Sequence, residues 1–197
     1  NPCMTRRKAF DETSALEKAV DLFWDQGYEA ASVRELSAAT GLSHSSLYNA
    51  FGDKHDVYLA ALERYRVQER EDFAATLAGQ GAVRPLLAGL FDALIDTLLA
   101  DGTRRGSFTL NAAIELGGRD EAVAELLRRH FDEVSDLLAG RLASAQAQGE
   151  IGRRFPAEDL ARQLLFGMYS LATMVKLYPD RALMEKSAEL TLAMLDC

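Results

Sequence analysis

The chain has 197 residues, of which 48% are hydrophobic and 26% charged. This length and composition exclude disordered and fibrous proteins and suffice for one large domain, or for a small domain joined to a larger one. Cysteine occurs only at positions 3 and 197, so neither a disulfide framework nor a thiolate metal site is indicated. The net charge of -8 by itself argues against a polyanionic partner such as nucleic acid.

The sequence predicts a soluble, cytoplasmic protein. Basic residues near the N-terminus are followed at once by Asp11 and Glu12 instead of an apolar run, which argues against a signal peptide. The most apolar window, Leu164 to Val175, is shorter than the roughly 18 apolar residues that a membrane span needs. Two isolated cysteines also fit a reducing compartment.

Apolar residues recur at helical spacing along almost the whole chain, and glycine, proline and aspartate interrupt them at intervals. Because no window alternates between apolar and polar residues as a strand would, we expect an all-α protein with nine helices. The predicted helices cover about residues 12–26, 32–41, 43–51, 53–79, 82–99, 108–116, 120–147, 156–177 and 181–195.

The second and third predicted helices are unusually short. Ser32 and Glu35 fit a capping box at the start of the second helix, and Gly41 fits the turn that follows it. Ser43 and Asp53 fit the N-cap positions of the third and fourth helices. The third helix, SHSSLYNAF from Ser43 to Phe51, has small polar residues on one side and apolar residues on the other. A capped short helix, a glycine turn and a second short helix form a helix-turn-helix pattern, whose second helix enters the major groove of DNA.

Several spaced motifs together resemble the DNA-binding region of the tetracycline-repressor (TetR) family of bacterial regulators, over about residues 10–62. The motifs are LFWDQGYEAAS, LYNAF and the lysine of GDK, together with the turn glycine between the two short helices. The resemblance is specific because several matches coincide at fixed spacing. Two positions depart from it: Ser37 stands where the family commonly has Ala, and Ala50 where His or another polar residue is frequent.

The resemblance implies a homodimer whose third helices read a palindromic DNA operator. Residues 1–55 would form the helix-turn-helix domain, and residues 56–197 the domain for ligand binding and dimerisation, with the eighth and ninth helices at the dimer interface. Carried over position by position, it implies base contacts from Arg34, His44, Ser45 and Asn49. It implies phosphate contacts from Val33, through its backbone, and from Ser46, Tyr48 and Lys54.

The later helices are longer and more apolar than the first three, and we expect them to bind a small, largely apolar effector. Candidate pocket residues are aromatic or soft side chains with a few polar groups, and most of them would equally suit an ordinary core. They are Phe91, Phe108, Asn111, Glu115, Phe131, Phe166, Met168 and Tyr169.

Local charge bears on how DNA would be held. The first 60 residues contain six basic and nine acidic residues, so affinity for DNA would rest on a few contacts doubled by dimerisation and would depend moderately on salt.

The sequence thus predicts a ligand-responsive dimeric transcriptional regulator, and it favours a repressor over an activator. The alternatives are an all-α small-molecule-binding protein or enzyme that does not depend on DNA, and a dimeric scaffold that has lost DNA binding. The chain has no P-loop, dinucleotide glycine motif, G-x-S-x-G or metal-ligand spacing, so we expect no enzymatic activity, cofactor or metal.

Overall fold

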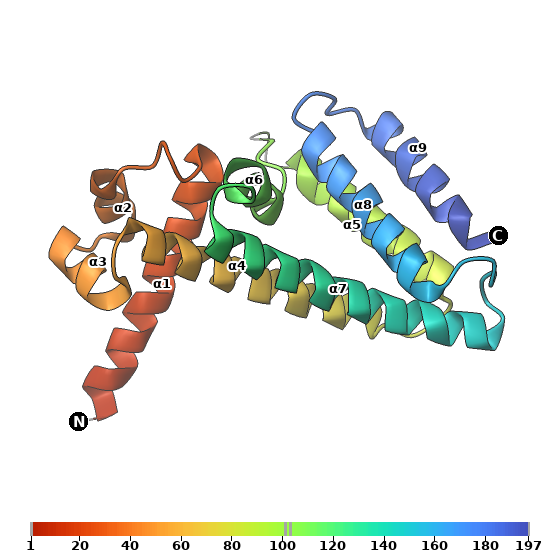
Figure 1. Cartoon of the computed structure of the whole chain (residues 1–197), viewed down its shortest axis with the longest axis horizontal. Helices are drawn as coiled ribbons and strands as arrows, with labels where there is room; N and C mark the ends of the chain where they lie inside the picture. The colour runs from red at the N-terminus through yellow and green to blue at the C-terminus, as the bar shows by residue number, and fades with distance from the viewer. Residues whose placement is uncertain (1, 101, 103, 197) are drawn as a thin grey trace. The chain divides into compact units, whose positions relative to one another are not determined.

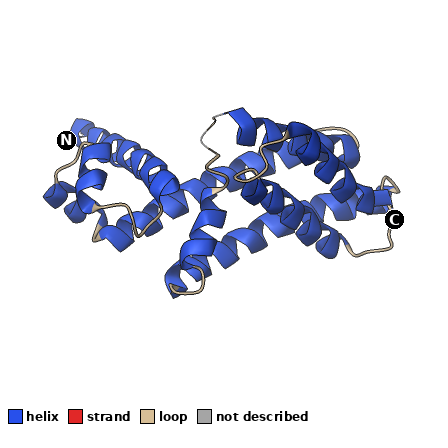
Figure 2. Cartoon of the chain, turned by 90° about the horizontal axis from the view of Figure 1, so that it is seen from above, coloured by secondary structure: helices blue, strands red, loops and turns tan. Residues whose placement is uncertain are grey.

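The computed structural model describes the backbone of residues 2–100, 102 and 104–196, and the side chains from residue 12 onward within those ranges. Helices joined by turns account for the described residues, among which no strand occurs (Figure 2). The all-α class with nine α-helices is thereby confirmed for this part of the chain. The elements are α1 Pro2–Gln26, α2 Val33–Thr40, α3 His44–Phe51, α4 Lys54–Leu77, α5 Val83–Ala100, α6 Phe108–Leu116, α7 Glu121–Gln148, α8 Ala157–Met174, α9 Arg181–Leu192 and the 3-10 helix η1 Ala193–Asp196.

Three helix ends differ clearly from the predicted ones. Helix α9 ends at Leu192 and not at Leu195, because the chain continues there as η1. Helix α1 begins at Pro2, ten residues before the apolar stripe on which its predicted start rested. Helix α8 ends at Met174 and not at Leu177, because the N–H groups of Leu177 and Tyr178 donate to the Met174 carbonyl at 2.9 and 2.8 Å and close a turn. Pro179 follows directly, and proline disfavours the helical conformation in the residue before it.

The chain forms two compact units, and neither is continuous in sequence. The first unit contains residues 1–68 and 111–127, and the second contains residues 69–110 and 128–197. Helices α4, α6 and α7 therefore each contribute to both units. We refer to residues 111–127 as the α6–α7 corner.

The core of the first unit is built where α1, α2, α3 and α4 meet. Phe23, Leu36 and Leu47 are almost completely buried, each from a different helix. The ring of Tyr58 on α4 is also buried and meets the Phe23 ring edge-on, with 4.9 Å between the ring centroids. Burying a side chain of this size stabilises a fold by about 1.5–3 kcal/mol, so the inward face of α3 is what fixes this short helix in place.

The second unit has its core among α5, α7, α8 and α9. Figure 1 shows α9 lying alongside α8 and α5, and all three helices contact one another. The most deeply buried large side chains there include Phe91, Ile95, Leu138, Leu142 and Leu164.

Helices α8 and α9 also carry large apolar side chains that the chain leaves uncovered. Phe166 and Met174 on α8 are 54% and 40% exposed, and Leu183 and Leu190 on α9 are 53% and 64% exposed. Spacings of eight and seven residues put each pair on one side of its helix. We call these four residues the α8–α9 apolar group. Among the described residues, no helix is both long enough and apolar enough to cross a membrane.

Candidate nucleic-acid interface

Helix α2 begins with the capping box that the sequence predicts. The Ser32 hydroxyl accepts from the Glu35 N–H at 3.2 Å, and the Ser32 N–H donates to the Glu35 carboxylate at 2.9 Å. The Ser32 hydroxyl also donates to this carboxylate at 2.6 Å, and these hydrogen bonds lower the pKa of Glu35. Two of the backbone N–H groups that a helix start leaves free are satisfied in this way.

The turn between α2 and α3 is held by backbone and side-chain bonds at the C-terminal end of α2. Gly41 has a φ of 73° in the left-handed region, where glycine has no steric cost, and its N–H donates to the Ser37 carbonyl. The Thr40 hydroxyl donates to the Leu36 carbonyl at 2.7 Å and accepts from the Leu42 N–H at 3.3 Å. The direction in which α3 leaves the turn is therefore well determined.

Helix α3 is capped at its start and anchored on its inner side. The Ser43 hydroxyl accepts from the Ser46 N–H at 3.1 Å, which confirms the predicted N-cap. The same hydroxyl donates to the Ser46 hydroxyl at 2.8 Å and lies 3.0 Å from that of Ser45. Leu47 is completely buried, so the polar side of α3 is left facing away from the core.

The residues expected to contact DNA come from α2, α3 and the first turn of α4. The four expected to reach bases, Arg34, His44, Ser45 and Asn49, are all exposed. Of those expected to reach phosphates, Ser46 is exposed, whereas Val33, Tyr48 and Lys54 are half-buried. The ring centroids of His44 and Tyr48 lie 4.2 Å apart, so a residue expected to reach bases contacts one expected to reach a phosphate.

Lys54 is held at the start of α4 by the turn that follows α1. Its ammonium group lies 4.5 Å from the centroid of the Tyr28 ring and 3.5 Å from the Glu29 carbonyl. A cation over an aromatic face is attracted by the ring quadrupole. Burial, and then the charge of Asp53, raise the pKa of the Tyr28 hydroxyl, so the ring stays neutral beneath the lysine.

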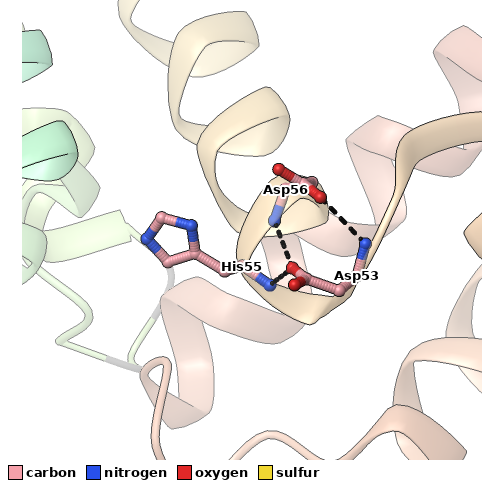
Figure 3. A group of neighbouring side chains, drawn as sticks. All are labelled: Asp53, His55 and Asp56. Carbon is pink, nitrogen blue, oxygen red and sulfur yellow. Dashed lines mark hydrogen bonds between the residues drawn. The ribbon is translucent and has the colours of Figure 1, made fainter.

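Figure 3 shows Asp53, His55 and Asp56, whose possible ligand atoms lie within 4.8 Å of one another. The Asp53 carboxylate accepts from the N–H groups of His55 and Asp56 at 2.8 and 3.0 Å, and the Asp56 carboxylate accepts from the Asp53 N–H at 3.0 Å. These bonds make Asp53 the N-cap of α4, as the sequence predicts. Both carboxylates are therefore engaged in the helix cap.

The α6–α7 corner packs against the N-terminal segment of the first unit through contacts that the sequence did not suggest. The Glu115 carboxylate accepts from the Tyr28 and Glu29 N–H groups, both at 2.9 Å. Nε2 of His55 lies 2.5 Å from Oδ2 of Asp120, the residue before α7. Gly27 permits this approach, since a Cβ atom there would come within 2.9 Å of the Glu115 carboxylate. Glu115 and Asp120 thus support the same turn and helix start that hold Lys54.

The eight candidate pocket residues are divided between the two units. Asn111 and Glu115 belong to the first unit, and Glu115 is engaged with the turn after α1. In the second unit, the Phe131 ring stacks on Phe166 at 5.6 Å and lies 6.0 Å from Tyr169. The remaining three candidates, Phe91, Phe108 and Met168, are buried.

Comparison with known proteins gives matches over both parts of the chain. The model of bacterial regulatory proteins of the tetR family matches residues 15–61. The model of the tetracyclin repressor-like C-terminal domain matches residues 84–190, which is more than half of the chain.

Individual relatives agree with these matches. The chain is 33% identical over 161 residues to the HTH-type transcriptional repressor ComR of Escherichia coli (strain K12), an alignment that covers 81% of this chain and 76% of ComR. It is 27% identical over 194 residues to YezE, an uncharacterised HTH-type transcriptional regulator of Bacillus subtilis (strain 168), covering 98% of this chain and 100% of YezE.

A solved structure is similar over nearly the full length. It is a cysteine mutant of the regulator CifR complexed with 26-base-pair double-strand operator DNA, with a TM-score of 0.82 and 28% identity. The match covers 93% of this chain and 95% of the CifR chain.

Proposed function

The chain belongs to the tetracycline-repressor (TetR) family of bacterial transcriptional regulators, and from this premise we propose that it is a repressor that leaves a palindromic operator when a small effector binds. It is a ligand-responsive, DNA-binding regulator and not an enzyme. We assign the DNA contacts to residues 1–55, and effector binding and dimerisation to residues 56–197.

The observation that carries the proposal is the outward side of α3. Leu47 is buried and the N-cap at Ser43 is formed, whereas His44, Ser45 and Asn49 are exposed on the same short helix. Imidazole, hydroxyl and amide groups can donate to or accept from base edges in the major groove. A helix whose inner side is buried and whose outer side is polar is suited to direct readout of DNA bases.

The remaining contacts complete a half-site. Arg34 on α2 reaches bases, and the Val33 backbone with the side chains of Ser46, Tyr48 and Lys54 binds phosphates. Because Ser45 and Ser46 are within hydrogen-bonding distance of Ser43 in the free protein, their hydroxyls exchange this partner for DNA. The position of Lys54 over Tyr28 orients one phosphate contact before DNA arrives.

A single helix-turn-helix reads only half of a palindrome, so the regulator needs a second copy of itself. The α8–α9 apolar group supports an interface made by α8 and α9 of both subunits, because exposed apolar side chains of this size are usually covered by a partner. The effector is small and largely apolar, and we place it in the second unit near Phe131 and Tyr169. A coupling of about 1–3 kcal/mol would lower operator affinity about 5- to 150-fold.

The test is retardation of DNA from the region upstream of the protein's own gene, at low salt. The unmodified protein is expected to shift this DNA, Lys54→Ala to bind it more weakly with a smaller salt dependence, and Tyr48→Phe to bind it more weakly through loss of the phenolic hydroxyl. Arg154→Ala, which removes an exposed arginine between α7 and α8, is the matched control and should bind like the unmodified protein. If the unmodified protein shifts no DNA, the proposal that the chain is a DNA-binding regulator fails.

A further inference from the structure

A group of polar side chains lies within the largely apolar second unit. It consists of Glu69 on α4, Ser107 before α6, Thr109 on α6 and His130 on α7. Ser107, Thr109 and His130 are only 8%, 4% and 2% exposed, whereas the Glu69 side chain is 33% exposed. This group, the polar cluster, therefore extends from a carboxylate near the surface to an imidazole in the interior.

Short contacts link the members of the polar cluster. Nε2 of His130 lies 2.9 Å from Oε2 of Glu69, and the Thr109 hydroxyl donates to the same oxygen at 3.4 Å. The hydroxyls of Ser107 and Thr109 are 2.8 Å apart. Burial, and then the charge of Glu69, raise the pKa of the Tyr169 hydroxyl. Tyr169 lies 6.0 Å from Phe131, which in turn stacks on the exposed ring of Phe166.

His130 has an unused hydrogen-bonding position. Both of its ring nitrogens are buried and make no hydrogen bond among the described residues, although Nε2 lies 2.9 Å from Oε2 of Glu69. A buried polar atom that is left unpaired destabilises the fold. In the neutral imidazole one nitrogen donates and the other accepts, and a hydrogen on Nε2, which faces the Glu69 carboxylate, leaves Nδ1 as an acceptor.

We infer that the polar cluster binds the hydroxyl group of the effector, with Nδ1 of His130 accepting its hydrogen, and that the effector is an uncharged phenol. This inference rests on the proposed function. The Glu69 carboxylate disfavours an anion close to His130, and burying a cation next to a carboxylate that already faces a histidine costs desolvation. The aromatic rings of Phe131 and Tyr169 suit a flat apolar body attached to the hydroxyl.

The polar cluster also lies close in sequence to the points where the chain passes into the first unit, which contains the residues proposed to contact DNA. The chain passes from one unit to the other between residues 68 and 69, 110 and 111, and 127 and 128. Glu69, Thr109 and His130 lie in sequence at or within two residues of these points. A ligand that changes how these three side chains are bonded therefore acts on all three helices that run on into the first unit.

The experiment is calorimetric titration of the full chain with three compounds of the same shape: para-propylphenol, its methyl ether para-propylanisole and the anion para-propylbenzoate. We expect the phenol to bind about tenfold more tightly than the ether, since one hydrogen bond in a buried site is worth about 1.4 kcal/mol, and the benzoate to bind most weakly. His130→Leu should abolish the preference for the phenol over the ether. Glu69→Gln should improve binding of the benzoate.

Ser135→Ala is the matched control, because Ser135 is another buried polar residue of α7 and is only 5% exposed. It should keep the preference for the phenol. Circular dichroism of each variant checks folding, and Glu69→Gln, at a partly exposed position, keeps the test valid if His130→Leu unfolds. Equal binding of phenol and ether, or binding of none of the three compounds, would overturn the inference. The proposed function is tested separately, because DNA retardation without any ligand does not involve the polar cluster.

Discussion

Ser37 places a hydroxyl group inside the first unit without a partner. Its oxygen is buried in α2 and makes no hydrogen bond among the described residues. An unpaired buried hydroxyl loses its bonds to water and gains none in return. The departure from the alanine that is common in the family at this position is therefore a cost to the fold.

Ser37→Ala is expected to raise the free energy of unfolding by about 1 kcal/mol, because it removes the unpaired group and introduces the best helix former. Urea unfolding followed by circular dichroism measures the change. Ser170→Ala on α8, at an exposed position, is the control and should gain only the smaller difference in helix propensity, about 0.5 kcal/mol. A destabilised Ser37→Ala variant would mean that the hydroxyl is bonded after all.

Single residues also show where the sequence was sufficient. Ser32, Glu35 and Ser43 form the caps that were predicted, because a cap depends on residues only three positions apart. Glu115 was predicted to line a pocket, and the structure shows its carboxylate bonded to Tyr28 and Glu29. Those partners lie 87 and 86 residues away in sequence, and no local sequence pattern predicts a contact over such a separation.

Among the elements, the bounds of α6 agree with prediction at both ends, whereas α1 and α8 differ. Helix α6 begins after a turn segment and ends before two glycines, so its limits are encoded locally. Helix α8 ends earlier than predicted because a turn precedes Pro179, and the apolar residues of that turn continue the helical pattern in the sequence. The division of α4, α6 and α7 between two units depends on tertiary packing, which hydrophobic periodicity does not report.

The N-terminus of α7 offers a test at the scale of an element. Asp120 Oδ1 accepts from the Val123 N–H at 3.0 Å, and the hydrogen bonds from Val123 and then from His55 lower the pKa of Asp120. A carboxyl group whose pKa is lower in the folded chain stabilises the fold above its unfolded pKa. That stability is lost as the pH falls through the folded value.

Asp120→Ala is therefore expected to lower the free energy of unfolding by about 1 kcal/mol at neutral pH, and the difference from the unmodified protein should shrink below the ordinary aspartate pKa of 3.8. Chemical unfolding at a series of pH values measures it. Asp120→Asn keeps a capping oxygen but loses the charge, so it should fall between the two. A difference that stays constant down to acidic pH would show that the charge of Asp120 contributes nothing.

Under the proposed function, two copies of the molecule bring two α3 helices to one operator. We expect the double variant Leu183→Glu and Leu190→Glu to be monomeric, because two charged groups would be buried at the proposed contact of α9 with its partner copy. Sedimentation velocity measures the change in mass. Ile114→Glu is the control, since Ile114 is 72% exposed on α6, outside α8 and α9, and this variant should remain dimeric. A double variant that still sediments as a dimer would place the interface elsewhere.

The discontinuity of the first unit limits how its parts can be exchanged between proteins. A chimaera that joined only residues 1–68 to a foreign effector half would bring the residues proposed to contact DNA without Glu115 and Asp120. The N–H groups of Tyr28 and Glu29, and the imidazole of His55, would then face unrelated side chains beside Lys54. A transplant that preserves operator recognition has to carry two segments, residues 1–68 and residues 111–127.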